Sequence, residues 1–113
     1  MQINETRHGG AVVVAPSGRI DSTTSSALEA HLQGLSRTGD HRIVIDFSGV
    51  DYISSAGLRV MLSLAKRTKE AHGGLALTGL GDSVHQVFEL AGFLPLFVVE
   101  ATNDAAVAKV VAA

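Results

Sequence analysis

Short apolar segments alternate with longer amphipathic ones along most of the chain. The first apolar segment is residues 11–18, AVVVAPSG, where a run of three valines favours a β-strand. Only Gly9 and Gly10 separate it from the extendable polar residues 2–8, so the two segments predict a β-hairpin. Pro16 has no N–H to donate, so we expect this strand to lie near an edge there or to be leaving the sheet.

The next segment predicts an amphipathic helix that ends near Gly39. Leu28, Leu32 and Leu35 follow one another at the i, i+4, i+7 spacing of one helical face. Asp21, together with the serines and threonines that follow it, provides candidates for the N-cap.

The most continuous apolar strand candidate is HRIVIDF, residues 41–47. Its Ile-Val-Ile centre does not alternate with polar residues, which is typical of a strand covered on both faces, so we expect it in the centre of the sheet. After a Ser-Gly turn, residues 54–70 show apolar side chains at helical spacing, with Leu58 and Met61 as core residues and basic residues at the far end.

The last third of the chain continues the alternation. Residues 74–80 predict a buried strand, residues 82–92 a helix capped by Asp82, and residues 96–100 a last strand, followed by a final helix capped near Thr102 to Asp104. This order, ββαβαβαβα, predicts an α/β fold with a mixed, mostly parallel sheet of about five strands and about four helices.

Composition limits the classes of function. The 113 residues allow one core, so we expect a single domain over residues 1–113, and 46% hydrophobic residues exclude a disordered chain. A net charge of -2 gives no basic surface for nucleic acid or for an anionic membrane. The chain has no cysteine and no membrane-spanning or signal segment, so we expect a cytoplasmic protein without direct membrane contact.

Motifs for catalysis and cofactors are missing from the sequence. The five histidines have no metal-ligand spacing, and neither a Walker A loop nor a complete Gly-x-Gly-x-x-Gly is present. There is no Gly-x-Ser-x-Gly elbow, although a Ser-His-Asp triad assembled from distant segments stays open at this point. We therefore expect no metal, no cofactor and no catalytic residue.

The stretch DYISSAGLR, residues 51–59, is the one place where polar residues suggest a site. Ser54 and Ser55 fall where the predicted helix begins, at the carboxyl edge of a parallel sheet, where α/β proteins commonly place function. One serine is enough to cap the helix, a contribution of about 1 kcal/mol. The other, beside the small Ala56 and Gly57, would be open to close approach by another protein.

Three segments carry a resemblance to a known family. APSGRIDSTTSSAL, RIVIDFSGVDYISSAGLRVML and VFELAGF, at these separations, resemble a STAS domain, and specifically the bacterial anti-sigma factor antagonists. The similarity runs from about Val12 to Val99 and implies that the chain is a single STAS domain.

The resemblance also implies a phosphorylation site. The family motif usually reads Asp-Ser-Ser/Thr-Gly-Leu, and its first serine is phosphorylated by a serine kinase that is also the anti-sigma factor. Matching Gly57 and Leu58 to its Gly-Leu places Ser55 at the phosphorylated position. Ser54 then stands where an aspartate is common, and Ala56 stands at the second hydroxyl.

Further residues are implied in partner binding. Asp21 matches the family's acidic residue after the second strand, near the phosphorylated serine, and it can also serve as an N-cap. Arg59, four residues after Ser55, is either a solvated charge or a contact to the phosphate or the partner. The expected partner-binding set is Asp21, Ser22, Thr23, Ser54, Ser55, Ala56, Gly57 and Arg59.

The implied function is a partner switch. The unphosphorylated protein would bind a serine-kinase anti-sigma factor and free a sigma factor, phosphorylation would break that complex, and a phosphoserine phosphatase would reset it. We expect a monomer that binds no nucleic acid. Two alternatives remain: a STAS accessory subunit that docks on an ABC transporter ATPase in lipid trafficking, and an enzyme that hydrolyses nucleotides.

Overall fold

Six strands and four α-helices alternate along residues 1–112, the part of the chain that the computed structural model describes. In chain order the elements are β1 (Gln2–His8), β2 (Ala11–Ile20), α1 (Ser25–Arg37), β3 (Arg42–Asp46), β4 (Gly49–Ile53), α2 (Ser55–Glu70), β5 (Gly74–Thr78), α3 (Asp82–Leu90), a 3-10 helix (Leu94–Leu96), β6 (Val98–Val99) and α4 (Asn103–Val111). The predicted α/β class is confirmed, with one strand more than expected. No helix within residues 1–112 is long and apolar enough to cross a bilayer.

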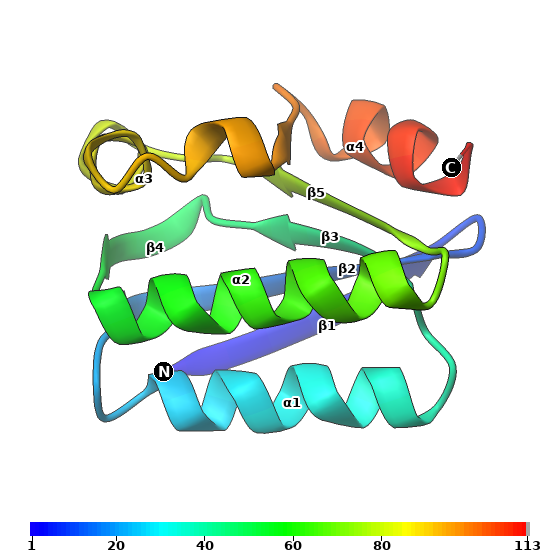
Figure 1. Ribbon diagram of the computed structural model, residues 1–113, viewed down its shortest axis with the longest axis horizontal. Coiled ribbons are helices and arrows are strands. Elements are labelled where there is room, and N and C mark those ends of the chain that lie inside the picture. Colours follow the sequence, from blue (N-terminus) through cyan, green and yellow to red (C-terminus); the bar gives the residue numbers. More distant parts are fainter. Residues whose placement is uncertain (113) are drawn as a thin grey trace.

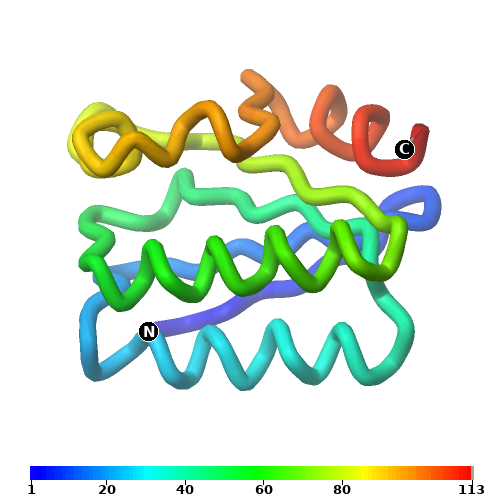
Figure 2. The backbone as a smooth tube through the Cα atoms, viewed as in Figure 1, coloured from blue at the N-terminus to red at the C-terminus, as the bar shows by residue number. Residues whose placement is uncertain are grey.

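The strands form one mixed sheet in the order β1-β2-β3-β5-β6. β1 and β2 are the predicted antiparallel hairpin, and all the other pairs are parallel. β4 lies off this path and pairs with β2. β3 lies between β2 and β5, as its continuous apolar sequence predicted, and Figure 2 follows the backbone through these neighbours.

Helices cover the two faces of the sheet unequally. Figure 1 shows α1 and α2 side by side across one face, and an ion pair from Arg67 to Glu29, with N and O atoms 2.9 Å apart, joins them. Successive strand residues point to opposite faces. Val12, Val14, Ile43 and Ile45 therefore enter the main core, while Ala11, Val13, Val44 and Ala76 form a smaller cluster with Ala106 and Val110 of α4.

The strand that the sequence pattern did not predict is β4. Within it only Val50 and Ile53 are buried, a spacing of three, so the period-two alternation that identifies a half-buried strand is absent. β2 is long enough to pair first with β3, at Val12–Val14, and then with β4, at Ser17–Ile20. The sheet therefore has six strands instead of about five.

The prediction that Pro16 marks an edge or the end of its strand is wrong. Pro16 is buried within β2, which has neighbours on both sides. The last pair with β3 is Val14 with Ile45, and the first pair with β4 is Ser17 with Gly49, so the proline falls between the two parallel ladders. Its missing N–H therefore leaves no bond of either ladder unmade.

Two boundaries near the C-terminus also differ from the predictions. The N-cap of α3 is Gly81, and Asp82 is the first helical residue, where its charge faces the positive end of the helix dipole. The last strand is only Val98–Val99, because the 3-10 helix occupies Leu94–Leu96. The predicted cap near Thr102 is confirmed, since its hydroxyl accepts a 3.1 Å hydrogen bond from an N–H of the first turn of α4.

Candidate functional site

The carboxyl ends of β2 and β4 meet at one edge of the sheet. Ile20 and Ile53 are register partners, and Ser54 N–H donates a 2.8 Å hydrogen bond to the carbonyl oxygen of Ile20. Asp21 follows Ile20 directly and Ser55 follows Ser54, so the structure brings the loop after β2 beside the start of α2, as Figure 1 shows.

Ser54 is the serine that caps α2. Its backbone is extended, with φ -91° and ψ 174°, and its hydroxyl oxygen accepts a 3.3 Å hydrogen bond from Gly57 N–H. Its carbonyl oxygen accepts the first intrahelical bond, from Leu58 N–H at 2.9 Å. Ser54 therefore fills the capping role for which one serine is enough.

Ser55 is the first residue of α2 and is exposed. Its hydroxyl makes no hydrogen bond with any group in residues 1–112. The free N–H groups of the first turn give the start of a helix a partial positive charge, which favours an anion there. Arg59, one turn further along the helix, is also exposed. Within residues 1–112 the site therefore presents an unbonded hydroxyl at the positive end of a helix dipole.

The small residues after Ser55 let the helix approach the sheet closely. Gly57 is buried, and a Cβ atom added to it would lie 2.7 Å from both Cγ2 of Ile20 and Cγ1 of Ile53. Contacts that short do not occur in real structures, so only glycine fits without displacement of its neighbours. Ala56 is half-buried beside it. Gly57 thus fixes the position of the first turn, and with it the position of Ser55.

Asp21 organises the turn before α1. Its Oδ1 accepts hydrogen bonds from Thr23 N–H at 2.9 Å, from the Thr23 hydroxyl at 2.7 Å and from Thr24 N–H at 3.1 Å. Ser22 and Thr23 are exposed on this turn. Asp21 is not the N-cap of the helix that follows, because α1 begins at Ser25 and its cap position is Thr24.

These hydrogen bonds make Asp21 a persistent anion. The Thr23 hydroxyl, followed by the N–H groups of Thr23 and Thr24, lowers the pKa of Asp21 to about 2. Its second carboxylate oxygen makes no hydrogen bond with any group in residues 1–112. The loop beside Ser55 therefore carries a fixed negative charge at neutral pH.

A cation–π pair that the sequence did not predict lies on the strands that lead into this edge. Arg19 and Tyr52 are register partners on β2 and β4, and the guanidinium carbon lies 4.3 Å from the ring centroid. Such a pair contributes about 0.5–1 kcal/mol at an exposed site. The two residues are 33 positions apart in sequence, so only the pairing of β2 with β4 shows that they touch.

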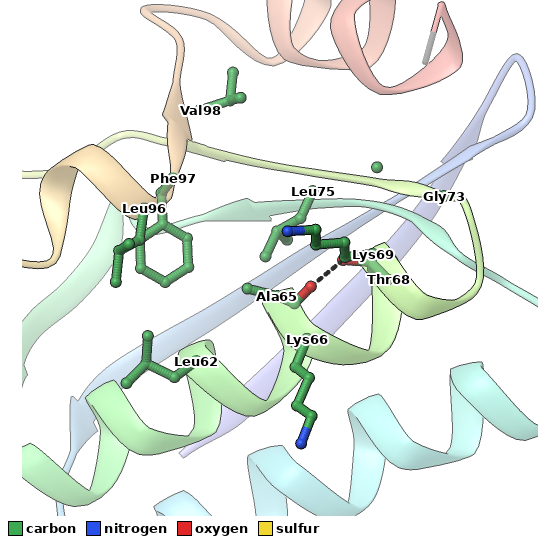
Figure 3. A pocket seen from close by; sticks show the side chains of 11 residues that line it. Leu62, Ala65, Lys66, Thr68, Lys69, Gly73, Leu75, Leu96, Phe97 and Val98 are labelled. Atoms are coloured by element: carbon green, nitrogen blue, oxygen red, sulfur yellow. Dashed lines mark hydrogen bonds between the residues drawn. The ribbon is translucent and has the colours of Figure 1, made fainter.

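A groove of about 480 Å³ lies along the second half of α2, away from Ser55. Figure 3 shows Leu62 and Ala65 of α2 on one side and Phe97 and Val98 on the other. Lys69 is drawn beside Leu75 at one end of the groove, whereas Lys66 points toward α1. The groove is lined from Leu62 onward, two turns beyond Ser55, so it is a separate surface.

Within residues 1–112, the histidine and carboxylate side chains are the groups that could hold a metal ion or activate a serine. No group of three among His, Cys, Asp and Glu is placed to hold a metal ion there. His31 instead pairs with Glu5 across α1 and β1, with Nε2 2.8 Å from Oε1. No histidine is hydrogen-bonded to Ser55 in this range.

The fold and the exposed serine together define a small α/β domain with an accessible hydroxyl at a helix start. A model of the STAS domain matches residues 2–106, nearly the whole chain. The chain therefore belongs to the STAS domain family.

Relatives of similar length carry a more specific name. BtrV of Bordetella bronchiseptica, provisionally named an anti-sigma factor antagonist, is 38% identical over 108 residues, covering 96% of this chain and 93% of BtrV. A crystal structure of an anti-sigma factor antagonist from Mycobacterium paratuberculosis is 28% identical, with a TM-score of 0.87 and coverage of 96% and 92%.

The fold is also shared with SpoIIAA, an anti-sigma factor antagonist from Bacillus that is 18% identical. The unphosphorylated form of SpoIIAA has a TM-score of 0.84, with coverage of 99% of this chain and 98% of SpoIIAA. The phosphorylated form has a TM-score of 0.74, with coverage of 96% and 99%.

A pair of glycine substitutions tests the close approach of α2. Gly57→Ala forces a Cβ atom against Ile20 and Ile53, so we expect a loss of about 1–3 kcal/mol in the free energy of unfolding. Gly34→Ala, inside α1 with open space at the same atom, is expected to gain about 0.5–1 kcal/mol. Denaturant titration measures both, and equal effects of the two changes would contradict the packing role of Gly57.

The pKa of Asp21 gives a second test. A carboxyl pKa that is lower in the folded state stabilises the fold above the unfolded pKa of about 3.9, and this stabilisation is lost as the pH falls through about 2. In a carboxyl-detected NMR titration, Asp21 is expected to titrate near 2, and Thr23→Val is expected to raise its midpoint toward the ordinary value. Ser22→Ala, which removes no bond to the carboxylate, is the control; an unchanged midpoint in Thr23→Val would refute the turn geometry.

Proposed function

We propose that this chain is an anti-sigma factor antagonist, a cytoplasmic binding module with no catalysis of its own. Its unphosphorylated form binds a serine-kinase anti-sigma factor and thereby releases a sigma factor. The kinase transfers the γ-phosphoryl group of ATP to the Ser55 hydroxyl, which loses its proton, and ADP leaves. A phosphoserine phosphatase reverses the modification. The observation that carries this proposal is the exposed Ser55 hydroxyl at the first position of α2, which makes no hydrogen bond within residues 1–112.

The fold can accept this modification. A phosphoserine carries about -1.5 to -2 charges at neutral pH, and a helix N-terminus stabilises an exposed anion by about 0.3–1 kcal/mol. The Ser55 hydroxyl makes no hydrogen bond within residues 1–112, so its phosphorylation would break none there. The modified and unmodified chains are therefore expected to keep the same fold.

The bound complex responds differently to the same group. A partner that covers Ser55 would have to desolvate the phosphate next to the Asp21 loop, whose carboxylate stays ionised because its pKa is about 2. Like charges brought together across an interface cost several kcal/mol. At about 1.4 kcal/mol for each factor of ten, a cost of 3 kcal/mol lowers the affinity roughly a hundredfold.

Ser54 caps α2 without the negative charge that the aspartate common at this position of the family motif would carry. Serine and aspartate are both good N-cap residues, and the Ser54 hydroxyl provides the cap here, at the position where the family motif usually has an aspartate. The acceptor Ser55 therefore has no carboxylate immediately before it. We infer that the kinase for this chain recognises the rigid helix start together with the Asp21 loop.

Substitution of Ser55 tests the proposal. Incubation with the serine-kinase anti-sigma factor and ATP is expected to label the wild type and Ser26→Ala, a control that removes an exposed hydroxyl near the start of α1, but not Ser55→Ala. Ser55→Asp is expected to weaken kinase binding at least tenfold in calorimetry without ATP, because the substitution places a permanent negative charge on the docking surface.

Three outcomes would count against this reading. Phosphate found at Ser54 or Ser22 in the Ser55→Ala variant would show that another serine is the acceptor. Unchanged affinity of Ser55→Asp would remove the charge switch. Purification of the chain with an ABC transporter ATPase, and with no sigma-regulating kinase, would favour the accessory-subunit alternative.

A further inference from the structure

The Arg19–Tyr52 pair lies on an exposed part of the sheet, although α3 runs beside β4 and its Ser83 hydroxyl donates a 3.2 Å hydrogen bond to the carbonyl oxygen of Asp51. Ile20 and Ile53, the next residues on β2 and β4, are buried on the side of α1 and α2, so the preceding pair faces the other side. On that side α4 packs on Ala11 and Val13, at the opposite end of β2. Tyr52 is 38% exposed and Arg19 is exposed as well, so a large aromatic ring is accessible on this surface.

The guanidinium group of Arg19 is held in place but has no anionic partner. It lies over the Tyr52 ring, and it forms no hydrogen bond or ion pair with any group in residues 1–112. Arg7 and Arg67, by contrast, each contact a carboxylate. A guanidinium presents a planar fork of N–H donors that matches a carboxylate. This exposed surface thus offers an aromatic ring and, above it, a guanidinium group whose N–H donors make no hydrogen bond within residues 1–112.

This surface continues into the serine site. Arg19 lies two residues before Asp21, and Tyr52 lies two residues before Ser54; two residues of strand span roughly 7 Å. The bond from Ser54 N–H to the Ile20 oxygen joins the two segments directly after the pair. A stable protein interface covers about 800 Å² on each partner, so a partner centred on Ser55 readily extends this far.

We propose that Arg19 and Tyr52 form a second anchor for the partner that covers Ser55, and that this partner presents a carboxylate side chain to the Arg19 guanidinium. The inference rests on the proposed function and adds to it the chemistry of the partner. Arginine and tyrosine are among the residues most enriched in binding hot spots. An acidic partner group also fits the switch, because a carboxylate attracted by Arg19 is repelled by a phosphate on Ser55.

The test measures the affinity of the full chain for the serine-kinase anti-sigma factor, without ATP. Arg19→Ala and Tyr52→Ala are each expected to weaken binding about 30-fold, equivalent to about 2 kcal/mol. Tyr52→Phe keeps the ring under the guanidinium and is expected to change the affinity less than threefold. Arg37→Ala removes an exposed arginine from the far end of α1 and is the matched control, with no expected change.

A merely structural cation–π pair gives a different result. In that case Arg19→Ala and Tyr52→Ala would lower the free energy of unfolding, yet the folded variants would bind within twofold of wild type, which overturns the inference. If Ser55→Asp still weakened binding in the same experiment, the proposed function would stand without the second anchor. An equal loss in Arg37→Ala would also overturn it, by showing a non-specific charge effect. Absence of any kinase binding by the wild type would overturn both proposals.

Discussion

The site depends on the contact between the start of α2 and the ends of β2 and β4. One hydrogen bond, from Ser54 N–H to the Ile20 oxygen, extends the β2–β4 ladder by one residue just before the helix begins. The absence of a side chain at Gly57 then lets the first turn rest on Ile20 and Ile53. The strand pairing on one side and the buried isoleucines on the other thus position the first turn beside the Asp21 loop.

This arrangement assigns different roles to two adjacent, chemically identical side chains. The Ser54 hydroxyl is used inside the protein, where it accepts from Gly57 N–H. The Ser55 hydroxyl makes no hydrogen bond within residues 1–112, so a contact made there by another molecule would break no internal bond. The two carboxylate oxygens of Asp21 differ in the same way. Oδ1 accepts the hydrogen bonds that order the turn before α1, whereas the second oxygen makes no hydrogen bond within residues 1–112 and is open to outside contacts.

The sequence predicted the features that depend on local pattern and missed those that depend on register. The start of α2 and the exposure of Ser55 followed from helical periodicity and from the family motif. β4 was missed because its buried residues, Val50 and Ile53, are three apart. The wrong prediction for Pro16 followed from this omission, because the pairing of β4 with β2 gives the strand a neighbour beyond the proline. The pairing of Arg19 with Tyr52 could not be predicted, because the register between β2 and β4 determines which residues lie opposite each other.

A rigid site favours a switch that acts through charge over one that acts through refolding. A conformational switch needs two packings of similar free energy, whereas the first turn of α2 packs so closely on Ile20 and Ile53 that a Cβ atom at Gly57 would collide with both. The charges around that position are mixed: Asp21 is held ionised on one side, and Arg19 is held over Tyr52 on the other. A phosphate on Ser55, as proposed above, would add about -1.5 to -2 charges to this mixed surface without requiring a second fold.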